Sequence, residues 1–156
     1  MIHPGQFRSE VIEPACQLCA GVGIPNTPYV RDLLMATAAQ ETLLGTWLRQ
    51  IRGPALGVFE IEPASYATLM RRCNDRQLSL LVELGDEGSL TYNLLYSAVV
   101  CRIFYWQVPE RLPVLTTKQT LWDYYKAHYN TLAGAATYSE FLHALSITDI
   151  KFASDQ

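Results

Sequence analysis

The chain has 156 residues, of which 49% are hydrophobic, which is enough for one globular domain with a buried core. Its formal net charge of −3 argues against binding to nucleic acid, because nucleic-acid-binding surfaces carry an excess of basic residues. No apolar run reaches the roughly 20 residues that span a bilayer, so no membrane span is expected. The first residues, Met1 to Gln6, lack a basic segment leading into an apolar one, so no secretory signal is expected.

The first half of the chain predicts two helices joined by a glycine-rich linker. The first helix is expected from about Phe7 to Ala20, with Pro14 kinking or delaying it. The second begins after Thr27, a good N-cap, and is expected to continue to about Gln50. One face of this second helix is apolar or small apart from a single carboxylate: Leu34, Ala38, Glu41, Gly45 and Leu48. A second apolar face indicates that this helix is central and buried.

The segment 54–62 is too rich in glycine and proline for a helix. Its alternation predicts a small β-turn or hairpin at about 54–62, with Phe59 and Ile61 on one side and Glu60 on the other. Further helices are expected at about 63–72, 76–84, 89–107, 118–129 and 138–145. The prediction is therefore a single mainly α domain over 1–156, with six to seven helices around a buried central helix, a core at about 7–145 and a peripheral tail at 146–156.

Glu41 is the residue that the pattern singles out. A carboxyl on an apolar helix face should point into the interior or into a cleft, where desolvation raises its pKa. A glutamic acid kept protonated near neutral pH is suited to act as a general acid. The alternative is a carboxylate that swings out to solvent or pairs with Arg49 or Arg52.

Two short motifs resemble those of the goose-type lysozymes and soluble lytic transglycosylases. The helix end Glu41-Thr42-Leu43-Leu44-Gly45 is similar to the Glu-Ser-x-x-Gly of that family, with Thr in place of Ser. The turn Gly57-Val58-Phe59-Glu60-Ile61-Glu62-Pro63 is similar to Gly-Leu-Met-Gln-Ile-x-Pro, with Glu60 where the family has Gln. The resemblance extends from about Phe7 to Leu142, and the chain looks like a compact bacteriophage-encoded form.

Two weaker matches lie further along the chain. Asn93 resembles the asparagine that opens the corresponding helix in lytic transglycosylases. Tyr129-Asn130 resembles part of an Ala-Tyr-Asn-Ala-Gly motif, although Thr131 follows and the next glycine comes late. The resemblance implies an α+β lysozyme-like fold with Glu41 as the catalytic residue and these substrate-binding residues: Thr42, Gly57, Phe59, Glu60, Ile61, Asn93, Tyr129 and Asn130. It implies no metal or organic cofactor.

By resemblance, the activity would be that of a muramidase or lytic transglycosylase. Glu41 would protonate the β-1,4 bond between N-acetylmuramic acid and N-acetylglucosamine in peptidoglycan. Hydrolysis and anhydro-forming transglycosylation both remain open, as does any role of Glu60 or Glu62 as a second carboxylate. The departure at Glu60 favours an alternative, in which the domain is a catalytically lapsed structural or ejection component of a phage virion. A third possibility is a module that binds peptidoglycan without cleaving it.

The expected partners are peptidoglycan glycan strands and, in the alternative, other virion proteins. Such a protein would be made in the host cytoplasm and would act in the cell wall or periplasm after passing a holin-type pore, or travel inside the phage particle. Cys16 and Cys19 form a lone Cys-x-x-Cys without the second ligand pair that structural zinc sites have. We therefore expect reduced cysteines packed among apolar residues. A Cys–His dyad of Cys73 or Cys101 with His128 is disfavoured, because nothing fixes its spacing.

Overall fold

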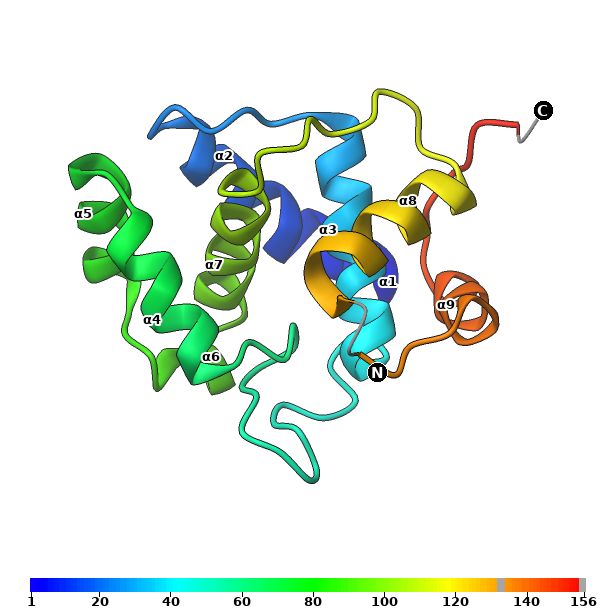
Figure 1. Ribbon diagram of the computed structural model, residues 1–156, viewed down its shortest axis with the longest axis horizontal. Coiled ribbons are helices and arrows are strands. Elements are labelled where there is room, and N and C mark those ends of the chain that lie inside the picture. Colours follow the sequence, from blue (N-terminus) through cyan, green and yellow to red (C-terminus); the bar gives the residue numbers. More distant parts are fainter. Residues whose placement is uncertain (132–133, 155–156) are drawn as a thin grey trace.

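The structure is a computed structural model that describes residues 1–131 and 134–154. These residues form helices joined by turns, and no regular strand is formed among them (Figure 1). The elements are α1 (Pro4–Phe7), the π-helix η1 (Arg8–Ile12), α2 (Glu13–Ala20), α3 (Pro28–Thr42), α4 (Pro63–Arg72), α5 (Asp75–Leu84), α6 (Ser89–Tyr92), α7 (Leu94–Trp106), α8 (Lys118–Tyr125), the π-helix η2 (Lys126–Asn130) and α9 (Tyr138–Leu145). The predicted mainly helical class is confirmed.

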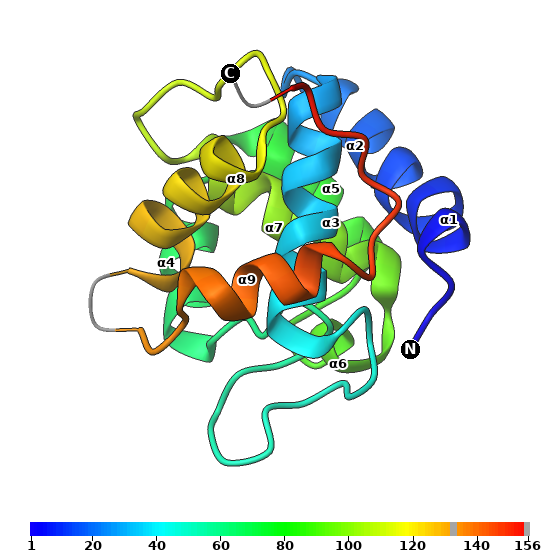
Figure 2. The same cartoon turned by 90° about the vertical axis from the view of Figure 1, so that its right-hand side faces the viewer.

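Helix α3 occupies the centre of the molecule. Thr27 caps it by accepting a hydrogen bond from the backbone N–H of Val30, and Pro28 stands at its first position. Helices α7, α8 and α9 all pack against it, and α9 crosses it on one side (Figure 2). Most of its side chains are buried, as the two apolar faces in the sequence predicted.

The predicted end of this helix at Gln50 is wrong, because α3 ends at Thr42. Leu43, Leu44 and Gly45 have φ values of 49°, 52° and 75°, which lie in the left-handed region and stop the helix. The backbone N–H groups of Leu43 and Leu44 still bond to α3, donating to the carbonyls of Ala39 and Ala38. Gly45 is therefore part of the helix terminus and not of its interior.

The loop that follows is tied back to the helix by Thr42. Its hydroxyl donates to the carbonyl of Val58 over 2.8 Å and accepts from the N–H of Gly45 over 3.0 Å. Further on, Leu56 and Ile61 exchange two backbone hydrogen bonds of 2.9 Å. Where a small β-turn or hairpin was predicted at 54–62, the structure has only isolated antiparallel bridges, between Arg49 and Leu56 and between Leu56 and Ile61.

Three other predicted helices have different bounds in the structure. The first predicted helix, expected from about Phe7, begins at Pro4. The π-helix η1, whose turns are wider than those of an α-helix, precedes Pro14. Pro14 has no N–H to donate to a regular helical turn. The predicted long helix over 89–107 is broken at Asn93, whose side chain caps α7 by accepting from the N–H of Tyr96. The helix predicted over 118–129 continues beyond Tyr125 as the π-helix η2.

The C-terminal segment 146–154 lies on the surface but is held to the domain. Arg8 forms ion pairs with both Asp149 and Asp32, at 2.9 Å and 2.8 Å. Ile150 is buried, and the N–H of Ala153 donates to the carbonyl of Thr116. In the described part of the chain, no helix is both long and apolar enough to cross a membrane.

Gly57 provides a stability test of the loop. Its φ is +79°, and a Cβ there would lie 2.0 Å from the carbonyl oxygen of Leu90. Gly57→Ala should therefore lower the free energy of unfolding in urea by about 3 kcal/mol or more. Gly23→Ala is the matched control, because Gly23 has a φ of +85° but nothing within 4 Å, so the cost should be about 1 kcal/mol. Equal losses in the free energy of unfolding for the two variants would contradict the close packing of Gly57 against Leu90.

Candidate active site

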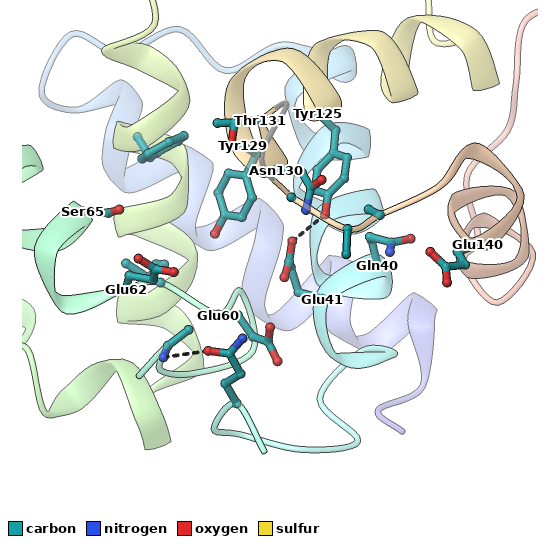
Figure 3. A pocket seen from close by; sticks show the side chains of 17 residues that line it. Gln40, Glu41, Glu60, Glu62, Ser65, Tyr125, Tyr129, Asn130, Thr131 and Glu140 are labelled. Carbon is teal, nitrogen blue, oxygen red and sulfur yellow. Dashed lines mark hydrogen bonds between the residues drawn. The ribbon is translucent and has the colours of Figure 1, made fainter. Parts of the chain in front are cut away.

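A cleft of about 650 Å³ opens beside the C-terminal end of α3 (Figure 3). It is bounded by α3, by the loop that leads into α4, by α7, by α8 with η2, and by the connection that leads into α9. Its lining residues are Gln40, Glu41, Gln50, Ala55, Glu60, Ile61, Glu62, Ser65, Phe104, Tyr125, Tyr129, Asn130, Thr131, Gly134, Ala135, Ala136 and Glu140. Four of these lining residues are glutamates and none is lysine, arginine or histidine.

Glu41 lies in the last turn of α3 and points into this cleft (Figure 3). The hydroxyl of Tyr125 donates a hydrogen bond of 2.6 Å to its Oε1 atom. Burial raises the pKa of Glu41 to about 8; the Tyr125 hydrogen bond lowers it, and the nearby Glu60 adds to the increase. Glu41 is therefore largely protonated at neutral pH.

Glu60 lines the same cleft from the loop that leads into α4, near Glu41 (Figure 3). The indole N–H of Trp47 donates to its Oε1 atom over 2.9 Å, which fixes the carboxylate. Its backbone has a φ of +46°, a left-handed conformation that is costly for a residue with a Cβ. The structure thus holds a second carboxylate near Glu41 in spite of a local backbone cost.

A group of tyrosines forms the wall behind Glu41. Tyr129 stacks on Tyr125 and Tyr105, with ring centroids 5.9 Å and 5.4 Å apart, and its hydroxyl donates to the carbonyl of Phe59 over 2.5 Å. Burial raises the pKa of each of these tyrosines and of the nearby Cys101 thiol. These groups therefore stay neutral at physiological pH.

The structure brings together only part of the predicted set of site residues. Glu41, Glu60, Ile61, Tyr129 and Asn130 all line the cleft. The other four lie outside its lining and have structural contacts. Thr42 ties the loop to α3, and Gly57 packs closely against the carbonyl of Leu90. Phe59 is buried against Phe7, and Asn93 caps α7.

Sequence reasoning missed Tyr125, which makes the direct contact to Glu41. Its position one helical turn before Tyr129 was the available signal, since residues four apart share a helix face. Trp47 was also missed as the partner of Glu60, because the segment around it was expected to be helical. The remaining missed polar residues of the lining are Gln40, Gln50, Ser65, Thr131 and Glu140.

Backbone strain concentrates around the cleft. The described non-glycine residues with positive φ are Leu43, Leu44, Glu60 and Thr131. The first two follow Glu41 within three residues, and the other two line the cleft. Residues in strained backbone conformations persist only where the surrounding structure holds them in place, and they are often found at functional sites.

The cysteines do not form a reactive site. Cys16 and Cys19 are buried free thiols on α2, and burial raises their pKa values to about 11 and about 12. Over residues 1–131 and 134–154, no group of three or more His, Cys, Asp or Glu side chains is placed to hold a metal ion. His128 is paired with Glu110.

Comparison of the chain with protein-family models, with curated proteins and with solved structures gave no match. The geometry and chemistry of the cleft are therefore the basis on which a function is assigned.

The raised pKa of Glu41 predicts a pH-dependent stability. Its folded pKa of about 8 exceeds the ordinary value of 4.5, so the folded state binds more protons between these two pH values. The free energy of unfolding should therefore fall as pH rises from 4.5 to 8. Glu41→Gln removes this loss, so the variant should gain up to a few kcal/mol over wild type at pH 8 and little at pH 4. A difference that does not change with pH in urea titrations would contradict a buried acid.

A second titration tests the contribution of Glu60. Because its negative charge disfavours ionisation of Glu41, Glu60→Gln should lower the pKa of Glu41, measured from the ¹³C shift of its carboxyl carbon by NMR. Glu62→Gln serves as the control, since Glu62 is an exposed neighbour on the same loop and should change this pKa less. A larger effect of Glu62→Gln would show that the two carboxyls do not face each other.

Proposed function

We propose that this protein is a peptidoglycan-cleaving muramidase or lytic transglycosylase with a lysozyme-like fold, in which Glu41 is the general acid. The single observation that carries this proposal is a glutamic acid with a raised pKa, hydrogen-bonded to Tyr125, inside an open cleft. The motif resemblance around Glu41 and Gly57 supports the same substrate. A cleft of about 650 Å³ lies within the roughly 300–1,000 Å³ of typical ligand sites.

In the proposed reaction, protonated Glu41 donates its proton to the glycosidic oxygen as the bond from that oxygen to the anomeric carbon breaks. The Tyr125 hydroxyl, already within hydrogen-bond distance, stabilises the carboxylate that forms. The carboxylate of Glu60 favours the positive charge that develops on the sugar ring. Glu41 then accepts a proton, either from water in hydrolysis or from the C6 hydroxyl of the muramoyl residue in transglycosylation.

The lining of the cleft suits a neutral sugar. Phe104 and Tyr129 offer aromatic surface, and Gln40, Gln50 and Asn130 offer amide groups that both donate and accept hydrogen bonds. Glu60 in place of Gln accepts hydrogen bonds but cannot donate them when ionised, so its sugar contacts differ from those implied by the resemblance.

The decisive experiment is clearance of purified peptidoglycan suspensions by wild type and by Glu41→Gln. Loss of the acid should slow clearance about a thousandfold, because amide nitrogen cannot supply the proton. Glu83→Gln, an exposed carboxylate change on α5 outside the cleft, should leave clearance within about twofold of wild type. Equal clearance by Glu41→Gln and wild type would refute the proposed role of Glu41.

The alternative is a lapsed lysozyme-like component of a phage virion, favoured by Glu60 at the position where Gln is implied. Sedimentation with the same peptidoglycan separates the remaining cases. Wild type that sediments with the wall without clearing it would be a binding module. Wild type that neither clears nor binds the wall would support the structural role.

A further inference from the structure

A second hollow lies next to the cleft and shares two lining residues with it. This groove, of about 420 Å³, is bounded by α4, the end of α7, the segment after α7 and η2. Its lining residues are Ala64, Ser65, Thr68, Leu69, Arg72, Phe104, Gln107, Val108, Pro109 and His128. Ser65 and Phe104 line both hollows, so the two hollows adjoin each other at these residues.

The walls of the groove are formed by α4 and by the end of α7. Ala64, Thr68 and Arg72 are spaced by four residues and form one row along α4. The side chain of Gln107 donates to the carbonyl of Leu69 over 3.0 Å, which joins the end of α7 to α4. The distance between the two walls is therefore set by a hydrogen bond as well as by packing.

The two hollows differ in the charged residues that line them. Besides Glu41, which is largely protonated, the cleft is lined by Glu60, Glu62 and Glu140, whereas the groove is lined by Arg72 and His128 and by no acidic residue. His128 is paired with Glu110, which leaves the Arg72 guanidinium as the uncompensated charge. Within the described part of the chain, Arg72 makes no ion pair and no side-chain hydrogen bond. A ligand that fits both hollows is neutral at one end and anionic at the other.

We propose that this groove, which we call the Arg72 groove, binds the acidic peptide substituents of peptidoglycan while the neutral glycan occupies the cleft beside Glu41. This inference rests on the proposed function. A peptide attached to a muramic acid leaves the glycan sideways and carries carboxylates, so it matches both the adjacency of the two hollows and the charge of Arg72. The guanidinium binds a carboxylate through two parallel hydrogen bonds, and the apolar part of the groove takes the peptide side chains.

The test measures binding of two glycan fragments of equal length, one with its peptides and one from which an amidase has removed them. Binding is measured calorimetrically with Glu41→Gln protein, so that cleavage does not interfere. In this background, Arg72→Gln should weaken binding of the peptide-bearing fragment about tenfold and change binding of the peptide-free fragment less than twofold. Added salt should weaken only the peptide-bearing interaction.

Arg71→Gln is the matched control. Arg71 is exposed next to Arg72 on α4, donates to the hydroxyl of Thr68 and does not line the groove. It should leave the affinity for both fragments unchanged, although it removes the same charge. Matching unfolding midpoints of the two variants show that both remain folded.

The possible outcomes separate this inference from the proposed function. If Arg72→Gln weakens binding of both fragments equally, or of neither, the Arg72 groove does not select peptide and the inference is overturned. Cleavage of the peptide-free fragment by wild type would then still uphold the role of Glu41. If wild type neither binds nor cleaves either fragment, both proposals fall together.

Discussion

The hydrogen bond between the hydroxyl of Tyr125 and the carboxyl of Glu41 joins α8 to the end of α3 inside the cleft. A carboxyl removed from water must either become protonated or form hydrogen bonds to its charged form. Glu41 has a raised pKa and also accepts a hydrogen bond from Tyr125. Burial favours the protonated form of Glu41, while the tyrosine hydroxyl donates a hydrogen bond to the carboxyl. The rest of the site is arranged around this contact: tyrosines behind it, Glu60 near it and the loop after α3 below it.

The early end of α3 lets the following loop turn back toward the helix. Had the helix continued to Gln50, as its apolar pattern suggested, residues 43–50 would not form the start of this loop. Three left-handed residues turn the chain away, and Thr42 fastens the returning loop through Val58. The same loop carries Glu60, which lines the cleft near Glu41. The strained helix terminus and the position of Glu60 therefore have one structural origin, the loop that follows α3.

The sequence was most informative where a pattern is local. Thr27, Thr137 and the spacing of apolar residues placed helices, and the lone carboxylate on an apolar face identified Glu41. The left-handed leucines were not predictable, because leucine disfavours that conformation and only the tertiary contacts hold it there. The contacts of Tyr125 with Glu41 and of Trp47 with Glu60 depend on the fold, although the four-residue spacing of Tyr125 and Tyr129 indicated a shared helix face.

Lys126 holds the connection that forms one rim of the cleft. Its ammonium donates to the side-chain oxygen of Asn130 and to the carbonyls of Gly134 and Ala136, at 2.7, 2.9 and 3.2 Å. A tetrahedral ammonium can direct separate protons to three oxygens that converge on it from different sides. Arginine carries the same charge, but its donors lie in one plane and would leave at least one of these oxygens unmatched. The shape of this rim therefore depends on lysine in particular, and not merely on a positive charge.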